Sequence, residues 1–180
     1  MKAISYLVPA LCAALPMLSG PALALPEDRE QPVRILAHNL DADGGTNLTI
    51  YSGDVVITQG SLQIHADRVE AHLSEGGKIR RVIAVGKPAR FQQQMAQSTV
   101  PVKARAQRIE YTVKTAELLL TGSAHVDRDG NTLAAERIDY DLNSEQMQAK
   151  GQSDGGRVEM IWKPETQNNG QSTDDTAQSQ

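Results

Sequence analysis

The sequence contains an internal repeat, and this repeat limits the chain to folds that place similar units in series. Four five-residue segments share the order Ala, polar residue, Arg or Asn, aliphatic residue, acid. We call them the repeat words, and they occupy residues 37–41, 66–70, 106–110 and 135–139. The first and second words are separated by the same interval as the third and fourth, while the middle interval is longer. The equal outer intervals predict tandem units of about 29 residues.

A glycine follows each repeat word, at Gly53, Gly86, Gly122 and Gly151. The distance from the start of the word to its glycine is the same in the first, third and fourth units, and it is longer in the second. The second unit therefore carries two insertions relative to the others. These insertions fall near 74–78 and 92–98, and both are polar, as surface loops are.

Apolar residues alternate with polar ones on both sides of the repeat words. Tyr111 and Val113 alternate after the third word, and Val55 and Ile57 alternate after the first glycine. A period of two predicts β-strands, and turn segments such as 129–131 separate them. No segment shows the 3.6-residue apolar period of an amphipathic helix. The sequence therefore predicts an all-β fold of many short strands, in which stacked units cover one another and the end units keep unpaired edges.

The start of the chain differs from the middle. Lys2, an apolar run over 3–18 and small residues at 22 and 24 predict a secretory signal peptide, residues 1–24, that is cleaved after residue 24. Prolines interrupt the apolar run, and it is shorter than the roughly 20 residues that a membrane span needs. We therefore expect a protein exported from the cytoplasm.

The end of the chain is polar, and residues 164–180 predict a disordered tail. The folded domain is predicted to be residues 25–163. Cys12, the only Cys in the chain, lies in the predicted signal peptide, so the domain is expected to be stable without disulfides.

The sequence offers no combination of residues that is typical of a catalytic centre. It has no Gly-x-Ser-x-Gly or His-Glu-x-x-His motif and no phosphate-binding loop. We therefore expect neither an enzyme nor a cofactor. His65 and Asp67 alternate on one predicted strand face, but two residues without a third ligand do not predict a metal site. The segment 127–131 resembles the start of a calcium loop, yet Ile138 stands where the closing Glu would be, so a hairpin turn is the better interpretation.

Charged residues are spread along the chain. The repeat words place Glu70, Glu110 and Asp139 two residues after an Arg, which favours a solvated ladder of charges over a set of acid–base pairs. The net charge is −4, and no block of Lys or Arg is interleaved with aromatic residues. These features argue against nucleic-acid binding.

The alternating apolar face leaves two interpretations open. One is a filled core between two sheets; the other is a pair of sheets that do not close fully and hold an apolar ligand between them. Aromatic residues make up only 3% of the chain, so large rings contribute little to a core. For the second interpretation the predicted lining residues are Val33, Ile35, Ile50, Val55, Ile57, Ile64, Phe91, Ile109, Tyr111, Val113 and Leu120.

Several short motifs occur in a fixed order along the chain. They are Gln-Pro-Val at 31–33, Gly-Asp-Val-Val-Ile-Thr-Gln-Gly at 53–60, Ile-His-Ala-Asp at 64–67, Gly-Lys-Pro-Ala at 86–89 with Phe91, Leu-Thr-Gly at 120–122 and Met-Gln-Ala at 147–149. With the predicted signal peptide and polar tail, this order resembles the periplasmic lipopolysaccharide-transport proteins of the LptA (OstA) family. The resemblance extends from about 31 to 163.

The resemblance implies a β-jellyroll of stacked short antiparallel strands, V-shaped in section, with an apolar groove that shields the lipid A acyl chains of lipopolysaccharide. Lipid contacts are implied for Val33 and Ile35, for Phe91, and for Tyr111 with Val113. The implied partners are LptC at the inner membrane, LptD/LptE at the outer membrane, and further copies of the chain joined head to tail in the periplasm.

Two alternatives to this function stay open. The chain could be a structural β-repeat scaffold of the cell envelope with a filled core, or an LptC-like relative that keeps its N-terminal segment as an anchor. A periplasmic hydrolase is disfavoured because the sequence has no convergent pair of acids.

Overall fold

A computed structural model describes residues 26–95 and 98–164, and in this part of the chain almost every element is an antiparallel β-strand. The elements are α1 (Pro26–Glu30), β1 (Arg34–Leu36), β2 (Asn39–Asp43), β3 (Leu48–Gln59), β4 (Leu62–Leu73), β5 (Ile79–Gln93), β6 (Val102–Thr112), β7 (Glu117–Arg128), β8 (Asn131–Asp141), β9 (Gln146–Lys150) and β10 (Glu159–Ile161). The predicted all-β fold is confirmed. Helix α1 was not predicted, since five residues are too few to show a helical period. The predicted signal peptide and residues 165–180 of the predicted tail lie outside the described residues.

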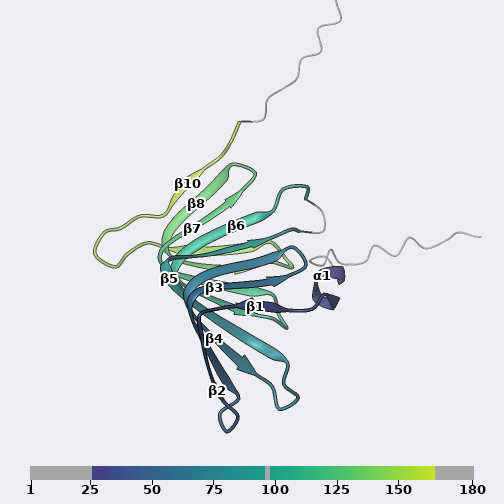
Figure 1. The fold of residues 1–180 in the computed structure, drawn as a ribbon. Helices are drawn as coiled ribbons and strands as arrows, with labels where there is room; N and C mark the ends of the chain where they lie inside the picture. Colours follow the sequence, from purple (N-terminus) through teal and green to yellow (C-terminus); the bar gives the residue numbers. More distant parts are fainter. Residues whose placement is uncertain (1–25, 96–97, 165–180) are drawn as a thin grey trace, which may run out of the picture.

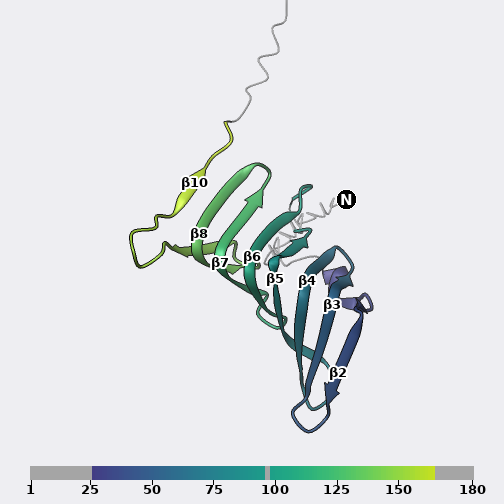
Figure 2. The same ribbon diagram turned by 60° about the vertical axis from the view of Figure 1, so that its left-hand side comes forward.

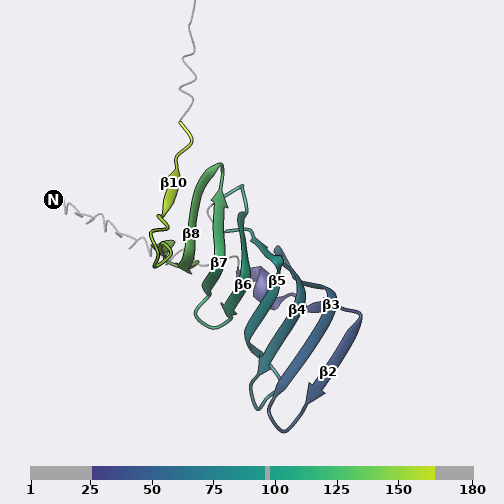
Figure 3. The ribbon, with the colours of Figure 1, turned by 90° about the vertical axis from the view of Figure 1, so that its left-hand side faces the viewer.

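The strands form one sheet in which each long strand pairs with the next along the chain. The order is β1-β3-β4-β5-β6-β7-β8-β10, with β2 also on β3 and β9 also on β8. Figures 2 and 3 show the strands stacked along a long axis, with β2 near one end and β10 at the other. Both ends of the stack therefore leave a strand edge without a partner among the described residues.

Each long strand bends sharply near its middle. In the β3/β4 pair the register runs from Ser52↔Arg68 to Val55↔Ala66, so two residues of β3 oppose one residue of β4. Such a bulge bends the sheet locally. The same register change occurs between β7 and β8. We call these bends the corners.

The corners divide the sheet into two arms that face each other, which gives the V-shaped section seen in Figure 1. The upper arm holds residues 55–66, 89–95, 102–106 and 124–135 with β1 and β10, and the lower arm holds residues 39–52, 68–85, 108–121 and 137–150. Strands β3 to β8 are 11 to 15 residues long, so each makes two of the short strand segments that the alternation predicted.

The repeat words lie at the corners. In β4, Ala66 is buried at the end of the upper arm and Val69 is buried at the start of the lower arm, while Asp67 and Arg68 between them are exposed. Because two successive side chains point outward, the inward-pointing residues of β4 have even numbers before the bend and odd numbers after it. This shift keeps an apolar side chain facing the interior on both sides of the bend.

Glycines of the repeat form the corner in the returning strands. Gly53 and Gly122 both have a φ of 81°, and the residues after them, Asp54 and Ser123, have φ values of 45° and 50°. This left-handed conformation is costly for residues with a Cβ and is free for glycine. A Cβ on Gly122 would also lie 2.9 Å from the Cβ of Gln107 on the neighbouring strand.

Ion pairs line the outer face beyond the corners, as the repeat words predicted. Arg68 contacts Glu70 at 3.3 Å, Arg108 contacts Glu110 at 3.5 Å and Arg137 contacts Asp139 at 2.8 Å. Exposed pairs of this kind contribute little to stability, typically about 0–1 kcal/mol each. They keep the outer face solvated.

The segment that resembles a calcium loop is the turn between β7 and β8. Asp129 and Gly130 have φ values of 53° and 81°, as the two central residues of a type I′ hairpin turn do. The backbone N–H of Gly130 donates to Asp127 Oδ1 at 3.0 Å. The predicted hairpin is confirmed.

The corner geometry predicts that Gly122→Ala destabilises the fold by about 2–3 kcal/mol, because the substitution adds both an unfavourable φ and a collision with Gln107. Gly77→Ala is the matched control, since Gly77 has a φ of 73° but nothing within 4 Å of an added Cβ. It is expected to cost about 1 kcal/mol. Urea denaturation measures both; equal losses would show that the corner tolerates a side chain.

Candidate functional site

The interior between the arms is one continuous apolar cluster to which both arms contribute. It is the candidate functional site because it contains most of the predicted lining residues. Seven of these, each at most 5% exposed, are Val55, Ile57, Ile64, Phe91, Ile109, Tyr111 and Leu120. They come from β3 to β7, so the stacking of strands brings together residues that are distant in the sequence.

Phe91 and Tyr111 pack across the interior from opposite arms. Phe91 lies on the upper arm in β5 and Tyr111 lies on the lower arm in β6. Their ring centroids are 5.7 Å apart with the ring planes tilted by 51°. This distance and tilt are in the favourable range for aromatic pairs. The contact holds the two arms together in the middle of the stack.

Three further predicted residues lie outside the buried cluster. Ile35 in β1 and Val113 after β6 are half-buried and pack against the core. Val33 precedes β1 and is 42% exposed. These positions are accessible from outside, whereas the seven buried residues are not.

The structure does not bring Ile50 into the interior. Its neighbours Thr49 and Tyr51 point inward, because Thr49 is 8% exposed and Tyr51 packs against the core. Successive side chains of a strand point to opposite faces. Ile50 therefore lies on the outer face, in register with Glu70.

Residues near the tip of the upper arm were missed by the sequence analysis. Gln93 and Met95 are 3% and 4% exposed, although they fall in a segment assigned to a polar insertion. The signal was present: Ala89, Phe91, Gln93 and Met95 continue one alternating series. The polar amide of Gln93 interrupts the apolar pattern and hides its continuation to Met95.

Helix α1 lies on the open side of the V (Figure 1). The backbone N–H of Ser61 donates to Asp28 Oδ1 at 3.0 Å, and the Ser61 hydroxyl also donates to the Asp28 carboxylate. Gln59 Nε2 donates to the backbone oxygens of Arg29 and Gln31 at 3.2 and 3.0 Å. These contacts fix α1 to the β3–β4 turn at the tip of the upper arm.

Burial in the interior raises the pKa of the Tyr111 phenol. The nearby charges of α1 act in opposite directions, since Arg29 lowers this pKa and Asp28 raises it.

Within residues 26–95 and 98–164, no three His, Cys, Asp or Glu side chains are grouped in a way that could hold a metal ion. In the same residues, none of the helical structure is both long and apolar enough to cross a membrane.

The fold and the interior define a class of protein: a bent antiparallel β-jellyroll with an apolar interior between its two arms. Residues 34–146 match the family described as LptA/(LptD N-terminal domain) LPS transport protein. The chain belongs to this family of lipopolysaccharide-transport proteins.

Individual relatives agree with this assignment. The chain is 38% identical over 140 residues to the lipopolysaccharide export system protein LptH of Pseudomonas aeruginosa, covering 78% of this chain and 79% of the relative. It is 31% identical over 155 residues to the lipopolysaccharide export system protein LptA of Escherichia coli K12, covering 86% and 83%. The crystal structure of P. aeruginosa LptH, described as the LptA-homologous periplasmic component of the lipopolysaccharide transport device, superposes with a TM-score of 0.70 at 33% identity over 77% of this chain and 100% of that one.

Tyr111 gives a pH-dependent prediction. Because its pKa is higher in the folded than in the unfolded chain, its contribution to stability is complete below the usual tyrosine pKa of about 10 and is lost as the pH rises through the folded value. Tyr111→Phe is therefore expected to reduce the loss of stability between about pH 9 and 11. Burial also raises the pKa of Tyr140, so the double variant with Tyr140→Phe should reduce the loss further. Urea midpoints against pH measure this; unchanged slopes would contradict it.

Proposed function

We propose that the protein binds lipopolysaccharide in the periplasm and shields the lipid A acyl chains in the interior between the arms. The observation that supports this most directly is the continuous apolar cluster, which receives side chains from both arms along the length of the stack. The relatives named as lipopolysaccharide export proteins support the choice of ligand.

The physical basis of the proposal is transfer of acyl chains out of water. Each buried methylene contributes about 0.8 kcal/mol, so several acyl chains strongly favour an apolar interior. The cluster is filled by side chains in this structure, so acyl chains would enter as the arms separate. Phe91 and Tyr111 are then the contact that has to open, and the half-buried Ile35 and Val113 are the residues that a chain would meet first.

A second candidate function follows from the same filled interior. A cluster whose central residues are 0–5% exposed also suits a structural module that never opens. The two functions differ in what a charge at the margin of the interior does, because a marginal charge repels an acyl chain but leaves a closed core intact.

Val113→Glu tests the lipid site. The added carboxylate would lie at the margin of the apolar cluster and is expected to weaken lipopolysaccharide binding by about tenfold or more, since an acyl chain would then have to desolvate a charge. Thr112→Glu is the matched control, because Thr112 is the adjacent, half-buried residue on the other face of β6. Binding is measured with purified lipopolysaccharide after thermal melting shows that both variants fold. Equal binding by the two variants would contradict an acyl-chain site between the arms, and no saturable binding by the unsubstituted protein would favour the structural module.

Photo-crosslinking tests which residues meet the lipid. A photoreactive residue at Phe91 or Tyr111 is expected to label lipopolysaccharide, whereas one at Glu117, which is exposed on the outer face of the lower arm, is not. Uniform labelling at all three positions would contradict binding in the interior.

We further propose that copies of the chain join head to tail and that the ends of the resulting bridge meet LptC at the inner membrane and LptD/LptE at the outer membrane. Both ends of the stack carry open strand edges with exposed apolar residues, including Leu40 on β2 at 58% and Ile161 on β10 at 54%. An open edge can add a strand from another chain. Contacts between unlike ends generate an open filament when the rotation from one copy to the next does not close a ring.

Charged substitutions at the two ends test this assembly. Leu40→Lys and Ile161→Lys are each expected to leave the chain monomeric, since every contact needs both unlike ends and each variant destroys one of them in all copies. An equimolar mixture should form dimers through the one intact pair of ends. Val85→Lys is the control, because Val85 is 40% exposed but lies on the central strand β5. Size-exclusion chromatography over a concentration series measures the assemblies; growth unaffected by either end variant would contradict the model.

A further inference from the structure

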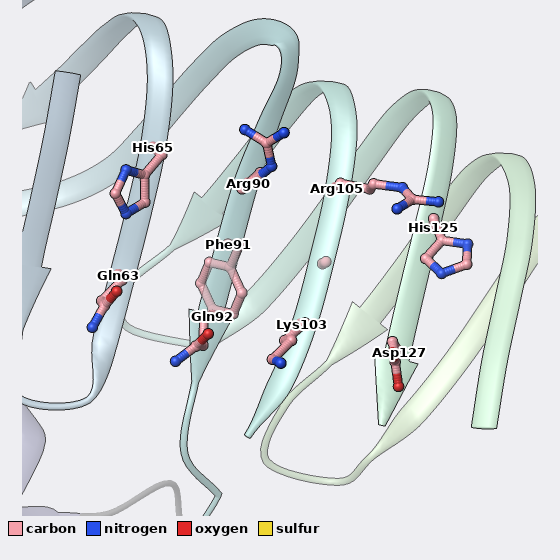
Figure 4. A pocket seen from close by; sticks show the side chains of 10 residues that line it. Gln63, His65, Arg90, Phe91, Gln92, Lys103, Arg105, His125 and Asp127 are labelled. Carbon is pink, nitrogen blue, oxygen red and sulfur yellow. The ribbon is translucent and has the colours of Figure 1, made fainter. Parts of the chain in front are cut away.

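A row of basic side chains crosses the outer face of the upper arm, on the side of the sheet opposite the interior. His65 is in register with Arg90, Arg90 with Arg105, and Arg105 with His125, so the four side chains come from β4, β5, β6 and β7. We call them the cationic row. Figure 4 shows them side by side across the four strands.

The cationic row lies in a shallow depression of about 330 Å³. Neighbouring strands are about 4.8 Å apart, so the four groups span about 15 Å. The next row of the same depression holds Gln63, Gln92, Lys103 and Asp127. Two arginines and one lysine thus share this depression with a single carboxylate, on a chain whose net charge is −4.

In the part of the chain that the structure describes, Arg90 and Arg105, at the centre of the row, lack the carboxylate partner that five other arginines have. Arg68, Arg81, Arg108, Arg128 and Arg137 each have a carboxylate oxygen 2.5–3.5 Å away. Among the described residues, no carboxylate lies within 4.0 Å of Arg90 or Arg105. The two arginines also stand directly opposite each other on adjacent strands. Like charges in this arrangement repel. An anion placed between them would relieve the repulsion.

We propose that the cationic row is a binding site for phosphate groups carried on a saccharide. Guanidinium groups bind phosphate through two parallel N–H···O bonds, and adjacent arginines suit a ligand with more than one phosphate. The amides of Gln63 and Gln92, paired in register beside the row, can donate to and accept from sugar hydroxyls. The site faces away from the apolar interior, so it does not depend on the proposed acyl-chain site.

Titration calorimetry with glucose 1,6-bisphosphate tests the proposal on the full chain. The probe is expected to bind more tightly than inorganic phosphate or glucose alone, and more weakly as salt is added. The double variant Arg90→Gln with Arg105→Gln should weaken binding about tenfold or more. The control double variant, Arg68→Gln with Arg108→Gln, removes two cations of similar exposure from the lower arm and should change the affinity less than about twofold.

The phosphosaccharide could be a free sugar phosphate or the headgroup of a glycolipid. Co-sedimentation with vesicles that contain lipid A distinguishes these sources: loss of vesicle binding in the Arg90/Arg105 double variant identifies a headgroup, and loss of probe binding alone identifies a free ligand. Labelling of lipopolysaccharide from Phe91 should persist in the double variant, so failure at this site is separable from failure of the acyl-chain proposal. No saturable binding of the probe, equal losses in both double variants, or inorganic phosphate binding as tightly as the probe would overturn the proposal.

Discussion

The bend at the corners is the constraint on which the rest of the structure depends. Each long strand must turn there and still pair with both neighbours on either side of the bend, because a buried unpaired backbone group would cost about as much as a lost hydrogen bond. Gly53 and Gly122 allow the turn through their left-handed φ, and the opposing repeat words supply two consecutive outward residues. Without the bend the sheet would present one long apolar face with nothing to cover it. With the bend, the sheet covers itself.

Self-covering makes the interior a core, and the composition of this core suits the proposed acyl-chain site. Its lining is mostly branched aliphatic side chains, and the aromatic pair Phe91 and Tyr111 is the only ring-to-ring contact found among the described residues. Contacts between aliphatic side chains and contacts between those side chains and an acyl chain have similar energies per methylene. In the proposed function, exchanging one kind of contact for the other would therefore cost the protein little, while the acyl chain would gain its transfer free energy from water.

The sequence predicted those features that depend on a local period or on repetition along the chain. Alternation predicted the strands, and the repeated Arg and acid predicted a solvated ladder of charges, whose members include the ion pair Arg137–Asp139. It failed where three-dimensional context decides. Ile50 faces outward because its neighbours Thr49 and Tyr51 face the core. Gln93 is buried despite its polar side chain. Helix α1 is held by Ser61 and Gln59, which are tertiary contacts that no local pattern shows.

The cationic row shows the same limit most clearly. Its members are far apart in the sequence, so no linear motif contains them, and only the register of four strands aligns them. Arg90 and Phe91 are consecutive, yet the period of two sends one to the outer face and the other into the interior. One strand thus contributes side chains to two chemically different faces of the sheet. A substitution at either position can change one surface and leave the other as it is, which is why the two proposed sites can be tested separately.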